Sequence, residues 1–95
     1  CACAIRSEGW TRGSDSKLHT DVDAAIVMDH LILAAANEGL GTCWICAFDP
    51  SAAKDVLGLP DGVEPVAFTP LGYAADSPRE KRRKCLGELV KYERW

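Results

Sequence analysis

The sequence has no apolar run near the roughly 18 residues that a membrane-spanning helix needs. It also lacks the basic segment and apolar stretch of a secretory signal peptide. It contains no G-x-S-x-G motif, no phosphate-binding P-loop and only two histidines, which excludes the corresponding hydrolase, nucleotidase and histidine-cluster metal sites. It has no internal repeat and no low-complexity tract. We expect no membrane partner and no nucleic-acid partner.

The residues that are present fit one globular domain or part of one. The chain has 95 residues and a mass of 10.3 kDa, with 47% hydrophobic and 26% charged residues, an ordinary globular composition. The charge is uneven, because residues 79–95 hold seven basic and three acidic side chains, whereas the rest holds four basic and eleven acidic ones. This imbalance indicates either an anion site near the C-terminus or a solvated, charged tail.

Five cysteines occur, an odd number without a signal peptide, which favours reduced thiols in a cytoplasmic protein over a disulfide framework. Cys43 and Cys46 form a C-x-x-C motif in a predicted strand, where residues three apart lie about 10 Å from each other on opposite faces. We therefore predict two small core thiols there, with no disulfide and no metal. Cys1 and Cys3 share a strand face. An alternative that remains open is that these two cysteines bind a metal together with a third cysteine.

Apolar spacing and turn residues predict an α+β fold of about three strands, with one long central helix, one short helix and a basic, amphipathic C-terminal tail. The predicted strands are residues 2–5, 42–48 and the middle of 63–73, and the predicted helices are residues 20–38 and 50–57.

The long helix is expected to begin with Thr20 and Asp23 as a capping box and to end at Gly39, which supplies a left-handed residue. Its predicted apolar face contains Asp29, whose buried carboxylate needs a partner. The other members of that face are Val22, Ala25, Ile26, Ile32, Leu33 and Ala36. A helix of about 19 residues spans roughly 28 Å, which is long for so short a chain and predicts a partner.

The short helix is expected to begin with Asp49 as its N-cap and Pro50 at its first position, and to end at Gly58. Its predicted inner face consists of Ala53, Val56 and Leu57.

From Asp21 onward, the order of motifs resembles the C-terminal half of the FMN-dependent nitroreductase family. The shared segments are Asp21-Val22-Asp23-Ala24-Ala25-Ile26, Leu33-Ala34-Ala35-Ala36, Glu38-Gly39-Leu40-Gly41-Thr42-Cys43-Trp44-Ile45, Phe48-Asp49-Pro50, Val56-Leu57-Gly58-Leu59-Pro60, Leu71-Gly72-Tyr73, the basic run 79–84, and Leu86-Gly87-Glu88-Leu89-Val90.

The resemblance implies a homodimer that holds FMN at its interface and transfers electrons from NAD(P)H to nitro or quinone-type acceptors. The helix of residues 21–38 would form the dimer core. The backbone of Ile45, Cys46 and Ala47 would lie beside the reactive edge of the flavin, and basic side chains would reach its phosphate. Those side chains are Lys81 and Arg83, or Arg82 and Lys84 in a shifted alignment.

Two functional hypotheses remain from the sequence. The family usually opens with an Arg-Arg-Ser-x-Arg type segment that contacts the phosphate and ribityl chain, and this sequence has no counterpart to it. One hypothesis is therefore an FMN-dependent oxidoreductase or a piece of one, and the other is a non-catalytic dimeric remnant that has lost its flavin.

Two cysteines depart from the pattern of the family. Cys46 stands where relatives often have Gly or Glu, and Cys85 stands where they often have Pro.

Overall fold

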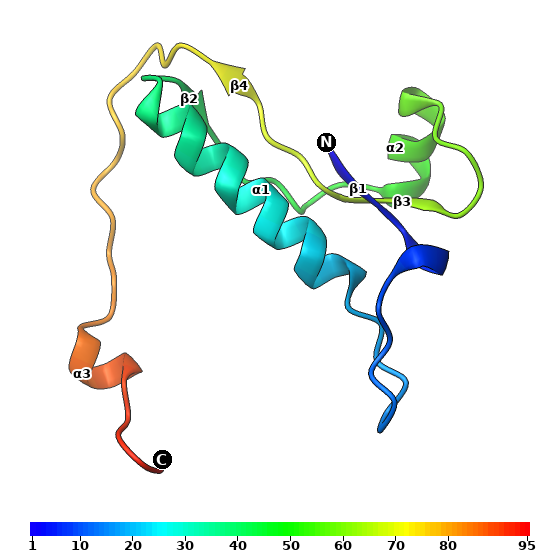
Figure 1. Ribbon diagram of the computed structural model, residues 1–95. Helices are drawn as coiled ribbons and strands as arrows, with labels where there is room; N and C mark the ends of the chain where they lie inside the picture. Colours follow the sequence, from blue (N-terminus) through cyan, green and yellow to red (C-terminus); the bar gives the residue numbers. More distant parts are fainter.

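The computed structural model describes all 95 residues and shows an α+β architecture (Figure 1), which confirms the predicted fold class. Four short strands form two antiparallel pairs beside one long helix. The elements are β1 (Ala2–Ile5), the 3-10 helix η1 (Arg6–Glu8), α1 (Thr20–Asn37), β2 (Gly41–Thr42), α2 (Pro50–Leu57), β3 (Val63–Ala67), β4 (Leu71–Gly72) and α3 (Leu86–Leu89). None of the helices combines the length and apolar character needed to cross a bilayer.

Pairing along the strands is interrupted by proline. β1 pairs with β3 and β2 pairs with β4, while Ile45 and Phe68 form an isolated bridge that continues the β2–β4 register. Between them, Pro70 has no N–H to donate to the ladder. The hydroxyl oxygen of Thr69 instead accepts a hydrogen bond from the Cys43 N–H, at 3.1 Å. The prediction of one strand over residues 42–48 is therefore wrong beyond Thr42 and Ile45.

The start of α1 differs from the predicted capping box. His19 occupies the N-cap position and its side chain makes no capping hydrogen bond. Thr20 is the first helical residue and is buried, because its side chain packs towards the loop that follows β1. The His19 ring lies against Trp10, with ring centroids 5.0 Å apart, although Trp10 remains exposed.

The buried face of α1 is not the face that the sequence spacing predicts. The helix packs on β1, β3 and β2, and its buried apolar residues are Ala24, Met28 and Ala35. Val22 and Ile26 from the predicted face are about half exposed, and Asp29 is exposed rather than buried. Small and apolar residues surround this helix, so spacing alone does not identify the face that contacts the sheet.

The ends of α2 are as predicted, but its inner face is not. The Asp49 carboxylate accepts hydrogen bonds from the N–H groups of Ser51 (2.9 Å) and Ala52 (3.5 Å), Pro50 is in the first turn, and Gly58 adopts a left-handed conformation. Ala53 is half-buried, whereas Val56 is 86% exposed. The helix contacts β3, and its Lys54 ammonium lies 2.7 Å from the Glu64 carboxylate.

The C-terminal tail extends away from the body of the molecule (Figure 1). The radius of gyration is 16.9 Å, whereas a compact domain of this length has a radius of about 12 Å. Residues 79–95 are exposed throughout, including the apolar members of α3. The body itself has a small core, since only 7 of the 95 residues are buried and Met28 is the only large apolar one. Much apolar surface is therefore left uncovered.

A side chain at position 9 is expected to disturb the packing around the start of α1. A Cβ at this position would overlap the Cγ2 of Thr20 and lie 2.9 Å from the Cδ1 of Leu18. Thr20 is buried and β-branched, so it has little freedom to move. We expect Gly9→Ala to lower the free energy of unfolding by about 1–3 kcal/mol, as overpacking does. Gly13→Ala is the matched control, because its Cβ meets nothing within 4 Å, and urea denaturation that affects both variants equally would contradict the packing argument.

Candidate flavin-edge segment and basic tail

The segment Ile45, Cys46 and Ala47 is anchored at its first residue. The Ile45 N–H donates to the Phe68 carbonyl and the Phe68 N–H donates to the Ile45 carbonyl, both at 2.9 Å. Phe68 is itself fixed by an edge-to-face contact with Phe48, whose ring centroid is 4.8 Å away. The chain on both sides of Cys46 and Ala47 is therefore held against the end of β3.

Cys46 and Ala47 have backbone N–H groups without a partner in the chain. Neither N–H donates a hydrogen bond to any backbone or side-chain acceptor, and both residues are exposed. The Cys46 carbonyl accepts from the Phe48 N–H at 3.1 Å, which shapes the turn that follows. Backbone N–H groups that are fixed in position and available can bind a ring heteroatom or stabilise negative charge.

The thiols of the C-x-x-C motif are exposed, so the prediction that they are small core residues is wrong. Cys43 and Cys46 do not lie in one continuous strand. The strand spacing that predicted a separation of about 10 Å between them therefore does not apply. The indole N–H of Trp44 instead donates to the Cys46 sulfur at 2.8 Å. This contact, which the sequence did not predict, holds the Cys46 side chain against the indole of Trp44.

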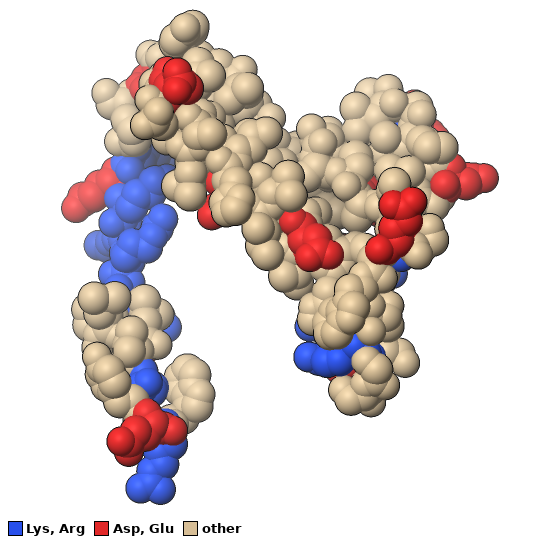
Figure 2. Space-filling model, in the orientation of Figure 1, with Lys and Arg blue, Asp and Glu red and all other residues tan.

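The structure does not bring the basic tail to this segment. Lys81, Arg82, Arg83 and Lys84 lie exposed on an extended stretch, and the only side-chain hydrogen bond among them joins the Arg83 guanidinium to the Arg82 carbonyl at 3.1 Å. No hydrogen bond or ion pair connects residues 79–95 with the remainder of the chain. Figure 2 shows this basic stretch projecting from the body.

The tail ends in a short, capped helix. The Cys85 N–H donates to the Glu88 carboxylate at 3.0 Å, and the Glu88 N–H donates to the Cys85 carbonyl, also at 3.0 Å. Hydrogen bonds from the Cys85 backbone and then its side chain lower the pKa of Glu88. Since the lowered pKa favours the charged form in the folded tail, the cap is present above the ordinary range of a glutamate pKa and is lost as the pH falls through the lowered value.

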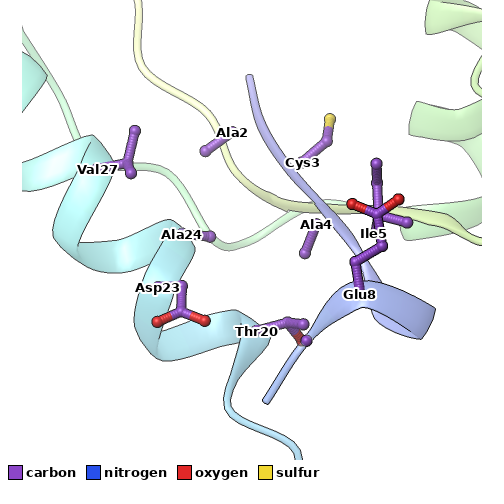
Figure 3. Close-up of a pocket in the computed structure, with 10 residues that line it drawn as sticks. Ala2, Cys3, Ala4, Ile5, Glu8, Thr20, Asp23, Ala24 and Val27 are labelled. Carbon is purple, nitrogen blue, oxygen red and sulfur yellow. The ribbon is translucent and has the colours of Figure 1, made fainter.

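A separate cavity of about 330 Å³ lies between β1 and the first turns of α1 (Figure 3). Its polar lining includes Glu8, Asp23 and Thr20, and it has no basic residue. An acidic lining disfavours a phosphate group. This cavity is therefore distinct from both parts of the predicted flavin site.

Three solved structures are similar to this chain. A nitroreductase family protein from Clostridium difficile 630 is 37% identical with a TM-score of 0.91, and the match covers 98% of this chain and 57% of that protein. A second from Clostridium novyi NT is 39% identical (TM-score 0.65), with 75% of this chain and 39% of that protein covered. A third from Streptococcus pneumoniae TIGR4 is 26% identical (TM-score 0.74), with coverage of 78% and 37%.

The chain therefore spans little more than half, or less, of the length of these proteins. The profile of the Nitroreductase family matches residues 4–73. This region includes α1, α2, β2, β3, β4, the second half of β1 and the segment with the available N–H groups. The chain belongs to the nitroreductase family.

Proposed function

We propose that this chain is part of an FMN-dependent oxidoreductase that passes electrons from NAD(P)H to nitro or quinone-type acceptors. Family membership supports a nitroreductase-like oxidoreductase. The observation that carries the flavin proposal is the pair of unpartnered N–H groups at Cys46 and Ala47, at the position that the sequence resemblance assigns to the flavin edge.

The residues of this segment fit a flavin ring. Ala47 has a side chain small enough to let a planar ring approach the backbone, and the N–H groups of Cys46 and Ala47 are fixed next to the Ile45–Phe68 bridge. FMN, when bound, supplies the hydride and electron transfer chemistry. The two N–H groups would position its ring and stabilise negative charge on the reduced form.

The basic tail would hold the phosphate. Lys81 and Arg83 carry full positive charges on an exposed stretch, and charge-assisted hydrogen bonds to phosphate are among the stronger ones in proteins. This role requires the tail to fold back towards a flavin site on its own chain or on a second copy.

We also propose that the functional unit is a homodimer built on α1. An open groove on this helix is lined by Val22, Ala25 and Ile26 together with the polar residues Asp21, Asp29 and His30, and Val22 and Ile26 are about half exposed. Only 7 of the 95 residues are buried within the chain. A second copy of the chain would cover apolar side chains that one copy leaves exposed.

The flavin proposal is tested by amide NMR of the isotope-labelled chain, with FMN and riboflavin titrated in parallel to millimolar concentration. Both ligands contain the ring, and only FMN contains the phosphate. We expect both to shift the amide resonances of Cys46 and Ala47, and only FMN to shift those of Lys81 and Arg83.

The outcome that contradicts the proposal is equally specific. If neither ligand moves the Cys46 and Ala47 resonances while other exposed residues respond, the segment is not a flavin site. The result would then favour the alternative, a dimeric member of the family without flavin function.

A further inference from the structure

We propose that the cavity between β1 and the first turns of α1 binds a small organic cation, a primary ammonium group attached to an apolar chain or ring. Its volume of about 330 Å³ lies at the lower end of the range of about 300–1,000 Å³ found for small-molecule sites. None of its lining residues belongs to the flavin-edge segment or to the basic tail. The inference is therefore independent of the proposed flavin chemistry.

Most of the cavity wall is apolar. β1 contributes Ala2, Ala4 and Ile5, and α1 contributes Ala24 and Val27. Ala4 and Ala24 are buried, and α1 packs on β1, so the backbone on both sides of the cavity is held in place. An apolar group that enters the cavity leaves contact with water, which favours binding.

Thr20 adds a buried hydroxyl group without a partner. The residue is 6% exposed, and its hydroxyl takes part in no hydrogen bond within the chain. The one fully enclosed side-chain polar atom without a partner is Nε2 of His19, so the Thr20 oxygen reaches open space, and the space that Thr20 lines is this cavity. A buried hydroxyl without a partner is unfavourable, and a ligand N–H group would satisfy it.

The charged side chains at the cavity are both negative. Glu8 of η1 and Asp23 of α1 line it, and no basic residue does. Both are exposed and neither belongs to the ion pairs of the chain. Figure 3 shows them on opposite sides of the Thr20 side chain. Thr20 and Asp23 are three positions apart, so they share a face of α1, and one ammonium group can bond to both.

The dipole of α1 opposes a cation at this end of the helix, because the N-terminus carries a partial positive charge. The first turn of α1 contains two carboxylates, those of Asp21 and Asp23. Their full negative charges offset the partial charge of the helix end. The net field at the cavity therefore favours a cation.

The lining distinguishes an organic ammonium ion from other charged ligands. No group of three or more His, Cys, Asp and Glu side chains in the chain could hold a metal ion. The two carboxylates repel an anion. An ammonium group donates up to three hydrogen bonds, which the Thr20 oxygen and a carboxylate accept while the carbon part of the ligand fills the apolar space.

The test is amide NMR of the isotope-labelled 95-residue chain, titrated in parallel with phenethylammonium, 2-phenylethanol and phenylacetate. These probes are similar in size and differ in charge. We expect phenethylammonium to produce saturable shifts at the amides of Ala4, Gly9 and Ala24, which line the cavity. The neutral alcohol should bind more weakly, and phenylacetate should produce no saturable shift. Added salt should weaken the binding of phenethylammonium, since it screens exposed charges.

Variants separate the charges from the hydroxyl. Glu8→Gln and Asp23→Asn should each weaken phenethylammonium binding about two- to fivefold, the size expected of an exposed ion pair, and leave binding of 2-phenylethanol unchanged. Asp55→Asn and Glu80→Gln are the matched controls, because both carboxylates are exposed outside the cavity. Thr20→Val keeps the β-branched shape and removes the hydroxyl. It should weaken phenethylammonium binding without lowering stability, because the hydroxyl has no partner to lose.

Several results would overturn the proposal. Equal binding of the three probes would remove the role of charge, and shifts confined to residues outside the cavity would remove the site. Equal effects of the cavity variants and their matched controls would do the same, as would the absence of saturable phenethylammonium shifts in the unchanged chain. Far-UV circular dichroism checks that each variant is folded, and the exposed Glu8 and Asp23 variants keep the test decisive if Thr20→Val unfolds.

Discussion

Ile26→Asp is expected to abolish the proposed homodimer at micromolar concentration. Ile26 is 51% exposed on α1, next to Val22 at 46%. Fully burying such a side chain contributes about 1.5–3 kcal/mol, and a symmetric interface contains each residue twice. The substitution removes this burial from both copies and places an unpaired carboxylate in the interface. We expect dissociation to become at least about 100-fold more favourable, which corresponds to about 2.7 kcal/mol.

Sedimentation equilibrium measures this directly. The unchanged chain should sediment as a dimer of the 10.3 kDa chain, and Ile26→Asp should sediment as a monomer or unfold. Val56→Asp is the matched control, because Val56 is 86% exposed on α2, outside the proposed interface. A stable, folded monomer of the unchanged chain at micromolar concentration would contradict the dimer, and equal effects of the two substitutions would place the interface elsewhere.

The second large effect concerns FMN affinity. We expect the 95-residue chain alone to bind FMN more weakly than a micromolar dissociation constant. Hydrogen bonds to a charged group contribute about 1.5–3 kcal/mol each before solvent screening, whereas micromolar binding needs roughly 8 kcal/mol. Lys81 and Arg83 are exposed and make no hydrogen bond with the segment of Cys46 and Ala47, so ordering the tail opposes binding.

Flavin fluorescence during titration with the chain is the measurement for this prediction. Weak, unsaturated quenching through the low micromolar range is the expected result. Saturable quenching in that range, lost in the double variant Lys81→Ala/Arg83→Ala, would show that the tail already completes a phosphate site within this chain. A double variant of Arg12→Ala and Lys17→Ala is the charge-matched control, because both residues lie in the loop before α1.

Local chemistry made several parts of the fold predictable. Asp49 and Pro50 specify the start of α2 through the N-cap hydrogen bonds and the missing proline N–H. Gly39 and Gly58, at the predicted helix ends, have φ values of +74° and +63°, which glycine adopts without a Cβ penalty. Each of these signals depends on a few neighbouring residues, so no knowledge of the tertiary structure is required.

The predictions from sequence were wrong where residues distant in the chain determine the local structure. Residues 42–48 have strand-forming composition, but Pro70 in the opposite segment interrupts their pairing. Thr20 is a good capping residue by type, yet its side chain packs against the Gly9 loop. The face of α1 that meets the sheet depends on which neighbours are present, and Ala24, Met28 and Ala35 are the apolar residues of α1 that are buried in the structure.

The candidate flavin segment has no local signature that could have found it. Every residue except proline carries a backbone N–H, so the availability of this group at Cys46 and Ala47 depends on which acceptors the fold places nearby. The resemblance to the family located the segment, and the structure added the two unpartnered donors and the Trp44–Cys46 contact. The basic run was visible in composition, but its position relative to the segment was not.

Intermolecular nuclear Overhauser effects test most directly whether a flavin ring contacts the backbone at Cys46 and Ala47, as proposed. With FMN at millimolar concentration and the labelled chain, we expect transferred effects between the ring protons of the flavin and the amide protons of Cys46 and Ala47. Exposed aromatic side chains offer the competing stacking sites, chiefly Tyr73, Tyr92 and Trp95. Effects confined to those aromatic residues, with none to Cys46 or Ala47, would contradict the account.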